Sequence, residues 1–441
     1  MKRRSKMLTD IPQINQALEF IKAEDDNTTQ ETLRMCQIAA PSFHEEKKAE
    51  YVCKRFEQIG LSDVHIDEVG NVLGTWHGTG KGPVIMLAAH TDTVFPIDTD
   101  VTVKKEGNRY YCPGINDDTH AVAEIITVAK AIIKHNIQTC GDIIFCANVC
   151  EEGLGDLKGI KHVFGKDTKI AEADGMKRGQ KLHIDAFVSV DNQVTGGIIY
   201  TATGSHRYEV EFKGNGGHSF ADFGLPNPIH AMGRAIAKIA DFKVPDNPKT
   251  TFNVGVVNGG TSVNTISADS TFLMDIRSDS REELDRMSKQ FFEAVNESVK
   301  EENARWDSDK PQVTVSIKPV GNRPAGVQDK NCEIVKAAWQ AAQIVGVMPE
   351  LRYESSTDAN IPISMGIPAV TVGRGGMEGG MHTLHEWYEP VEAWLGPQRD
   401  MLLVLMLAGV DSYCKPVIKK SIKIPVEWRQ IFEKRNTIIV K

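Results

Sequence analysis

The chain has 441 residues, more than one ordinary hydrophobic core uses, so its length predicts about two or three folded units. Hydrophobic residues make up 41% of the chain and charged residues 25%, which excludes collagen-like, coiled-coil and wholly disordered proteins. The formal net charge of −8 argues against a general binder of nucleic acid or of anionic membranes. We expect small molecules or peptides as binding partners.

The cysteines include no C-x-x-C pair, which predicts a reducing compartment and no disulfide framework. The basic first residues resemble the start of a signal peptide, but the residues that follow, 11–16, are not a continuous apolar stretch. The longest apolar run, 401–410, is shorter than the about 18 residues that a membrane span needs. A cytoplasmic protein that does not insert into membranes is therefore expected.

The first third of the chain alternates helical and strand patterns, which predicts a layered α/β domain with a mostly parallel central sheet. A capping-box pattern from Ser42 to Glu45 predicts the start of a helix that runs to about Ile59. Strands are expected at 64–69, 84–89 and 142–149, with a buried helix at 121–133 between the last two. This strand, helix, strand order implies right-handed crossovers.

From about residue 200 the pattern becomes typical of strands with one exposed face. Strands are expected at 207–213, 251–257, 270–276 and 312–318, and helices at 228–239 and 281–299. This β-α-β-β-α-β order matches a ferredoxin-like split unit. The α/β pattern then resumes, with a helix at 330–346, a strand at 369–372 and a final helix after Pro390. The ferredoxin-like unit is therefore inserted into the larger α/β domain.

These patterns divide the chain into four segments. Residues 1–203 and 320–414 are the two parts of the α/β domain, 204–319 form the inserted domain, and 415–441 form a basic C-terminal extension. The extension has eight Lys or Arg and two Glu. We interpret it as a solvated segment packed over the domain, and a nucleic-acid-binding arm is the less favoured alternative.

His90 and Asp92 directly follow a predicted apolar strand. Residues two apart on a strand point to the same face, so an imidazole and a carboxylate emerge together at the strand's C-terminal end. Ligands bind at that end of open α/β sheets. Because a metal-bound imidazole usually donates its second N–H to a carboxylate, Asp92 would orient His90. By itself this pair is a weak signal of function.

Other carboxylates and an imidazole share this placement at the end of a strand or in a loop. They are Asp117-Asp118, Glu151-Glu152, Asp191 and His382. Considered alone, Asp117 and Asp118 are more simply explained as helix-capping residues. Glu151 and Glu152, at the end of an apolar strand, would repel each other unless a cation or a shared proton relieved the repulsion. Taken together, the five positions predict a metal centre.

Oxygen and nitrogen ligands without thiolate suit Zn²⁺, Mn²⁺ or Co²⁺, and the number of carboxylates favours two ions bridged by one Asp. Two ions about 3.5–4 Å apart can generate hydroxide from water and stabilise the oxyanion formed when it attacks a carbonyl group. A spare carboxylate beside them could accept the proton of the water. This chemistry is typical of a metal-dependent hydrolase.

The order of these motifs resembles that of the M20 metallopeptidases, and the resemblance extends from about residue 30 to residue 413. It implies a zinc-peptidase-like α/β catalytic domain with an inserted ferredoxin-like dimerisation or lid domain. It also implies two divalent ions per subunit, with Zn²⁺ as the first choice and Co²⁺ or Mn²⁺ as alternatives. The implied roles are His90 and Asp191 for one ion, Glu152 and His382 for the other, Asp117 as the bridge, Glu151 as the general base and Asp92 as the supporting catalytic carboxylate.

The inserted domain resembles the same family. The segment from Gly214 to His218 resembles a G-x-x-x-H-S/A element, whose His crosses a dimer interface and stabilises the tetrahedral oxyanion in the partner's site. Two further elements, ending in Asn264 and Arg277, resemble those that contact the substrate and its carboxylate. The alternatives are a loop role for His218 and an ordinary ion pair for Arg277. The resemblance thus implies a homodimer.

Three features depart from the family pattern. Thr119-His120 stand where many relatives have Lys followed by Gly or Ala, and His120 is either an added contact or, more simply, a residue packed beside the site. Ser355-Ser356 replace two Gly of a G-G-T-D-A segment, which concerns the substrate pocket. His385 could replace His382 as a ligand, but His382 is preferred because it lies four residues before Glu386, as in the family's H-x-x-x-E pattern.

The sequence therefore predicts a metal-dependent hydrolase of peptide or other amide bonds. The first choice is an aminopeptidase that acts on di- or tripeptides. The alternatives are an N-acyl-amino-acid deacylase or carboxypeptidase of the same family and, from another class, a metal-binding scaffold protein without turnover. The expected substrate is a small peptide or an N-acyl amino acid, and neither nucleic acid nor a membrane is expected as a partner.

Overall fold

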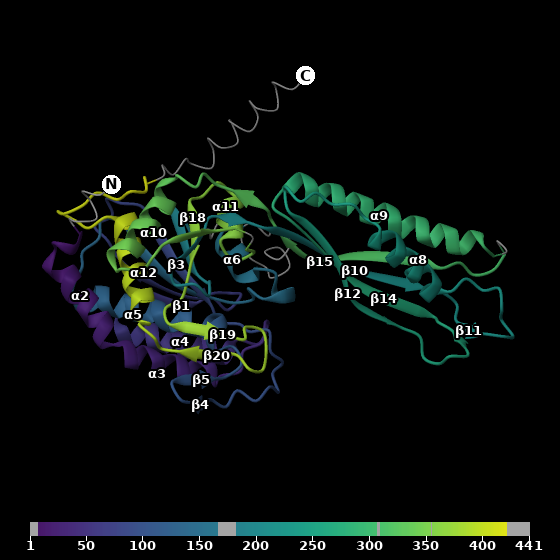
Figure 1. Cartoon of the computed structure of the whole chain (residues 1–441), viewed down its shortest axis with the longest axis horizontal. Helices are drawn as coiled ribbons and strands as arrows, with labels where there is room; N and C mark the ends of the chain where they lie inside the picture. The colour runs from purple at the N-terminus through teal and green to yellow at the C-terminus, as the bar shows by residue number, and fades with distance from the viewer. Residues whose placement is uncertain (1–7, 166–181, 307–308, 354, 421–441) are drawn as a thin grey trace, which may run out of the picture.

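The structure, a computed structural model, describes residues 8–165, 182–306, 309–353 and 355–420. The described residues form two lobes that lie end to end (Figure 1). The large lobe contains the N-terminal and C-terminal parts of the chain, and the small lobe contains the part between them. No helix in these ranges is long and apolar enough to cross a membrane. Most of the predicted basic extension lies outside the described residues.

An eight-stranded sheet forms the centre of the large lobe, in the order β1-β2-β6-β3-β7-β18-β8-β17. The four central strands, β6, β3, β7 and β18, run parallel and are buried along their whole length. The bounds are β1 (Ser62–Ile66), β2 (Val72–Trp76), β3 (Ile85–His90), β6 (Ile143–Asn148), β7 (Ala186–Val190), β8 (Gly197–Ile199), β17 (Glu350–Arg352) and β18 (Ala369–Val372). Parallel strands covered on both faces are continuous apolar runs, as the sequence predicts.

Helices cover both faces of this sheet. Alternate residues of β3 point to opposite faces, so Ile85 and Leu87 pack in the core that contains α5 and α12, whereas Met86 packs in the core that contains α6 and α11. The helices of the large lobe are α2 (Pro12–Ala23), α3 (Asp25–Cys36), α4 (Glu46–Ile59), α5 (Ala121–Lys134), α6 (Lys158–Val163), α10 (Glu333–Ile344), α11 (Asn360–Ser364) and α12 (Leu395–Ala408). Of these, α2, α3, α6 and α11 were not expected from the sequence.

Two details of the large lobe correct or extend the sequence prediction. The capping box predicted at Ser42 is wrong, because α4 begins at Glu46 and Glu45, the residue before it, makes no side-chain cap. A second small sheet lies beside the irregular helical turn η1 (Ile115–His120) that precedes α5. Its strands, also not expected, are β4 (Lys104–Glu106), β5 (Arg109–Tyr111), β19 (Met377–Gly379) and β20 (Trp387–Glu389).

The small lobe has a four-stranded antiparallel sheet in the order β12-β14-β10-β15, and two helices pack on it around a separate hydrophobic core. Its elements are β10 (Gly204–Lys213), α8 (Pro228–Ala240), β12 (Thr250–Gly259), β14 (Asp269–Ser278), α9 (Arg281–Ala304) and β15 (Thr314–Arg323). This chain order and strand order are those of the predicted ferredoxin-like unit. Four short strands form two further pairs: β11 (Gly217–His218) with β13 (Thr265–Ile266), and β9 (Thr201–Ala202) with β16 (Gly326–Val327). The single turn η2 (Gly153–Gly155) contacts β15.

Candidate metal centre

Three neighbouring parallel strands end at the same edge of the large sheet. His90 is the last residue of β3, Glu151 and Glu152 follow β6, and Asp191 follows β7. Because β6, β3 and β7 are adjacent and parallel, their carboxyl ends meet, and the side chains that follow them converge. The sheet order therefore explains why residues from three distant parts of the sequence share one site.

The carboxylate of Asp117 lies at the centre of this site. Its Oδ1 is 3.1 Å from Nε2 of His90, and its Oδ2 is 3.0 Å from Nε2 of His382. The same His382 nitrogen is 2.9 Å from Oε1 of Glu152. One carboxylate thus faces an imidazole on each side, which is the arrangement required of a group that bridges two cations.

The possible metal-ligating atoms form two main groups, which share Asp117. One contains His90, Asp117, Asp118 and Asp191, and the other contains Asp117, Glu152 and His382, with all ligand atoms of a group within 4.8 Å of one another. A third group joins His90 to the glutamate pair. The five predicted ligands are therefore brought together, in the two sets that the family resemblance implies.

Two other candidate ligands have partners within the protein. Asp118 Oδ2 accepts the backbone N–H of His90 at 3.0 Å, and its Oδ1 accepts a bond from Arg374 at 2.7 Å. His120 is buried, with Nδ1 3.0 Å from the Thr32 hydroxyl and Nε2 3.0 Å from Glu124. His120 is therefore a packed residue beside the site, which was the simpler of the two interpretations.

The second imidazole is that of His382, because His382 belongs to a ligand group with Asp117 and Glu152, whereas His385 belongs to none of the three groups. The backbone of His382 has a φ of 62°, a left-handed conformation that is uncommon outside glycine and that often marks functional positions. Hydrogen bonds with Asp117 and Glu152 raise the pKa of the His382 imidazole to about 10. A cation bound by these carboxylates would take the place of that proton.

The electrostatics of the cluster fit divalent cations. Burial, together with the charges of Asp117 and Asp118, raises the pKa of Asp191 well above its usual range. Burial likewise raises the pKa of Glu151 to about 8, although the charge of Arg323 acts in the opposite direction. Buried carboxylates at this density are costly unless cations compensate them. The donor atoms are oxygen and nitrogen alone, a set that suits Zn²⁺, Mn²⁺ or Co²⁺.

Asp92 holds the glutamate pair in place. Its Oδ1 accepts the backbone N–H of Glu151 at 2.9 Å, and its Oδ2 accepts the backbone N–H of Glu152 at 3.0 Å and the Ser42 hydroxyl at 2.6 Å. The predicted contact of the Asp92 carboxylate with His90 is longer than these bonds, because His90 Nδ1 is 3.4 Å from Oδ1. The same nitrogen is closer, at 3.0 Å, to the backbone carbonyl of Asp92. The fully buried Asp92 side chain thus acts as a support for the site.

Glu386 plays a similar part for the loop that carries Asp117. One carboxylate oxygen accepts the backbone N–H groups of Asn116 at 2.8 Å and Asp117 at 3.2 Å, and the other accepts that of Gly114 at 3.1 Å. Glu386 lies four residues after His382. The H-x-x-x-E pattern therefore contributes twice to the site: its His is a candidate metal ligand, and its Glu holds the loop of a second candidate ligand, Asp117.

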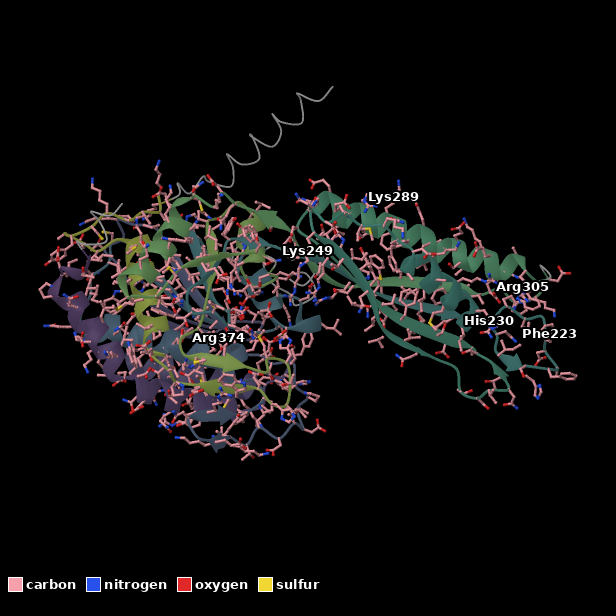
Figure 2. All side chains as sticks on the ribbon, viewed as in Figure 1. Phe223, His230, Lys249, Lys289, Arg305 and Arg374 are labelled. Carbon is pink, nitrogen blue, oxygen red and sulfur yellow. The ribbon has the colours of Figure 1, made fainter. Side chains whose placement is uncertain are left out.

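Two buried arginines belong to the site and were not predicted. Arg323 Nη1 donates to Glu151 Oε1 at 2.9 Å, and its Nη2 donates to the Glu151 backbone carbonyl. Arg374, inside the large lobe (Figure 2), donates to Asp118 and, at 3.2 Å, to Asp191. Neither arginine belongs to a motif. The available signal was that each occurs near the end of a strand, as Asp191 does.

The cluster opens into a cleft of about 490 Å³ between the lobes. Arg277, predicted to contact the substrate, lines this cleft, and so do Ser355 and Ser356. His218 and Asn264 do not line it. They lie together near β11 and β13 at the far end of the small lobe, where Ser219 N–H donates to the Asn264 carbonyl at 3.0 Å (Figure 1). Within one chain the structure therefore leaves these two predicted residues outside the site.

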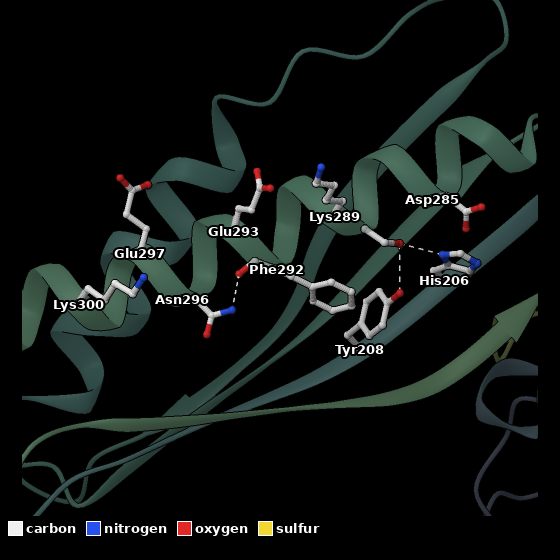
Figure 3. Close-up of a pocket in the computed structure, with 10 residues that line it drawn as sticks. His206, Tyr208, Asp285, Lys289, Phe292, Glu293, Asn296, Glu297 and Lys300 are labelled. Carbon is white, nitrogen blue, oxygen red and sulfur yellow. Dashed lines mark hydrogen bonds between the residues drawn. The ribbon is translucent and has the colours of Figure 1, made fainter.

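A larger hollow of about 940 Å³ lies on the small lobe, against α9 and β10 (Figure 3). At one end of it, the Ser288 hydroxyl is 2.8 Å from His206 Nδ1 and 3.1 Å from the Tyr208 hydroxyl. It contains none of the residues of the three ligand groups. The cleft beside the cluster is accordingly the candidate active site.

Comparisons with known proteins agree with the predicted family. A succinyl-diaminopimelate desuccinylase of Nitrosospira multiformis is 25% identical over 385 residues, covering 81% of this chain and 93% of the relative. The structure of a tripeptidase from Staphylococcus aureus has a TM-score of 0.69 and 21% identity, covering 87% of this chain and 98% of that chain. YxeP of Bacillus subtilis, described as a dinuclear metal-binding peptidase of the M20 family, has a TM-score of 0.62 and 18% identity, covering 88% and 99%.

A family model also matches residues 86–407. That range contains the two ligand groups with Asp117 between them, the glutamate pair and the entire small lobe. Fold, site and sequence therefore lead to one assignment, and the chain belongs to peptidase family M20/M25/M40, hydrolases that act on amide bonds.

Proposed function

We propose that this hydrolase is an aminopeptidase of di- or tripeptides that works with two divalent ions, Zn²⁺ as the first choice and Co²⁺ or Mn²⁺ as alternatives. The observation that carries the proposal is the pair of ligand groups that share Asp117, with Glu151 beside them in the cleft. In this proposal His90 and Asp191 hold one ion, and Glu152 and His382 hold the other. The similarity to a tripeptidase supports the choice of substrate.

The residues of the chain divide the remaining work. When bound, the two ions would make a water molecule more acidic and stabilise negative charge on the carbonyl oxygen. Glu151 accepts the proton of the attacking water and later delivers it to the leaving nitrogen. Arg323 keeps the Glu151 carboxylate in position, and Asp92 fixes the backbone of both glutamates. Arg277 would bind a carboxylate of the substrate with its planar fork of donors.

A deacylase or carboxypeptidase that removes an acyl group from an amino acid is the second candidate. Arg277 would serve such a substrate equally well, and the desuccinylase relative supports it.

The cytoplasmic location and the domain boundaries at 203/204, 319/320 and 414/415 stay predictions. β15 continues to Arg323, beyond the second of these boundaries.

We also propose that the active unit is a homodimer. His218 and Asn264 are exposed at the far end of the small lobe, away from the cluster of their own chain. Around them lie two of the most exposed apolar side chains of the described residues, Phe220 at 88% and Val263 at 101%. A second copy could cover these side chains and receive His218 in its cleft, where His218 would stabilise the oxyanion and Asn264 would contact the substrate.

The decisive experiment offers a tripeptide with a free N-terminus, its N-acetylated form and a set of N-acyl amino acids to the protein in the presence of Zn²⁺, Co²⁺ or Mn²⁺. We expect the free tripeptide to be cleaved fastest and chelation to abolish turnover. Preference for the N-acylated compounds would select the deacylase instead. No turnover of any compound by protein that retains two ions would select the scaffold interpretation.

Glu151→Gln separates catalysis from metal binding. The amide cannot accept the proton, so we expect turnover to fall about 10²–10⁴-fold while the two ions per chain and the melting temperature stay unchanged. The measurements are kcat/KM, metal content by mass spectrometry and thermal unfolding. Turnover equal to that of the wild type would remove Glu151 from the mechanism.

A further inference from the structure

Five arginines line the cleft, and their partners divide them into two classes. They are Arg207, Arg277, Arg323, Arg352 and Arg374. Arg323 and Arg374 are buried and bind the carboxylates of the metal cluster. The other three have more exposed side chains, at 15%, 46% and 41% for Arg207, Arg277 and Arg352, and their charges are only partly compensated. The positive charges of the second class therefore influence which substrates the cleft binds.

Arg207 and Arg277 share a single carboxylate. Asp275 Oδ1 is 3.1 Å from Nε of Arg207, and Asp275 Oδ2 is 2.7 Å from Nε of Arg277. Two guanidinium groups against one carboxylate leave one positive charge in excess. The terminal nitrogens of Arg277 make no hydrogen bond to another described residue, and its side chain is 46% exposed. Arg277 is thus free to bind an anion.

Arg352 approaches the same cleft from the large lobe. It is the last residue of β17, the edge strand of the main sheet. Its Nε is buried yet has no hydrogen-bond partner in the described part of the chain, and lies 3.5 Å from Glu350, whose side chain is 58% exposed. The next residue, Tyr353, packs edge-to-face on Tyr200 with ring centroids 5.5 Å apart. β17 pairs with β8, with Arg352 opposite Ile199, so the sheet holds the backbone of Arg352 beside the cleft.

We propose that Arg352 determines specificity by binding a second carboxylate of the substrate, in addition to the carboxylate that Arg277 binds. The preferred substrates would then be acidic: small peptides or N-acyl amino acids with an acidic side chain or an acidic acyl group besides the terminal carboxylate. This inference rests on the proposed hydrolytic function. Two partly compensated guanidinium groups from opposite lobes favour a dianion, and they disfavour substrates that place a cation there.

The first test compares pairs of substrates that differ in one carboxylate. Ala-Glu is compared with Ala-Gln, which places the extra carboxylate on the C-terminal side of the scissile bond. N-succinyl-alanine is compared with N-succinamoyl-alanine, in which an amide replaces the free carboxylate of the acyl group, on the other side of the bond. We expect kcat/KM to favour the acidic member of at least one pair about tenfold. Arg352→Met should remove this preference by lowering kcat/KM for the acidic member much more than for the neutral member, and Arg352→Lys should retain part of the preference.

Arg34→Met is the matched control. Arg34 is also partly exposed, with a single acidic partner, Glu31, at 3.4 Å, but it lies on α3, outside the cleft. We expect this variant to keep the preference of the wild type. Equal turnover of acidic and neutral members by the wild type, or an unchanged preference in Arg352→Met, would overturn the proposal.

A binding experiment distinguishes failure of this inference from failure of the proposed function. Glutarate and glutaramate, which differ in one carboxylate, are titrated by calorimetry into metal-loaded Glu151→Gln protein with and without Arg352→Met. We expect glutarate to bind about tenfold more tightly, and only when Arg352 is present. This result would support the anion site even if no substrate were hydrolysed. Equal binding of the two probes, or an advantage of glutarate that survives in Arg352→Met, would overturn it even if peptides were cleaved.

Discussion

The residues predicted to act in catalysis lie in two regions with opposite surroundings. At the metal cluster, Asp117 and Glu151 are 6% and 4% exposed, and hydrogen bonds from other loops fix them. At the far end of the small lobe, His218 and Asn264 are exposed, and their hydrogen bonds among the described residues stay within the two paired loops that carry them. The first region is complete within a single chain, and we propose that a partner subunit completes the second.

The difference follows from how each region is stabilised. The sheet order of the large lobe brings the strand ends together, so the metal ligands are positioned by the same packing that forms the core. The short β11-β13 pair has no such layer, and exposed apolar side chains surround it. The cluster should therefore respond to substitution as a site complete in one chain. The far end of the small lobe should respond as part of an assembly.

The largest effect is expected from Asp117→Asn. The amide removes the negative charge that faces His90 on one side and His382 on the other. Both ions should be lost on dialysis, and kcat/KM should fall on the order of 10⁴-fold, the upper end of the loss expected for Glu151→Gln. Metal analysis and steady-state kinetics measure these effects. Glu301→Gln on the surface of α9 is the control, and two retained ions in Asp117→Asn would contradict a bridging role.

The same contrast explains which parts of the fold could be predicted. The central strands and α5 are long apolar runs, because both of their faces are buried, and such runs are recognisable without a structure. α3 was not recognisable, since its buried face includes Thr28 and Thr32, which bond to the Thr127 hydroxyl and to His120. A buried face made of threonines has no apolar periodicity, so its packing is apparent only in the folded chain.

The site shows the same limit. The five proposed ligands could be singled out in the sequence because each follows a strand or a loop with a distinct motif. Arg323 and Arg374 were not, since their partners Glu151 and Asp118 lie 172 and 256 residues away in the sequence. Such pairs depend on which strands are neighbours, and strand order cannot be read from local pattern. The fold therefore determines which carboxylate pairs with a buried arginine that belongs to no motif.

A smaller effect is expected from His218→Ala. If His218 stabilises the oxyanion in a partner's cleft, its loss should lower kcat about 10²–10³-fold and leave the metal content of the chain unchanged. His230→Ala is the matched control, because His230 is also exposed on the small lobe (Figure 2). Unchanged kcat in His218→Ala would leave His218 with the loop role that was its alternative interpretation.

Mixing two inactive variants tests whether His218 acts across an interface. A heterodimer of Glu151→Gln and His218→Ala contains one cleft with an intact Glu151 that receives an intact His218. Random exchange of subunits should therefore restore about a quarter of the wild-type activity. Activity that stays at the sum of the two variants, although subunit exchange is verified by mass spectrometry, would exclude action in trans.

The smallest effect is expected from Ser42→Ala, which probes the support of the cluster. The Ser42 hydroxyl donates to Asp92 Oδ2, but Asp92 keeps the backbone N–H groups of both glutamates, so kcat/KM should fall about tenfold or less and the free energy of unfolding by about 1 kcal/mol. Ser412→Ala, which removes an exposed hydroxyl bonded to Asp411, is the control and should be neutral.

A double-mutant cycle distinguishes this support from the helix cap predicted for Ser42 from the sequence. If the hydroxyl acts through Asp92, Ser42→Ala should have little further effect on either quantity in an Asp92→Asn background, because the charged acceptor is already gone. A helix cap would instead cost the same free energy of unfolding in both backgrounds, since α4 does not depend on the charge of Asp92. Full additivity would therefore restore the capping interpretation, and strong coupling would tie Ser42 to the backbone of the glutamate pair.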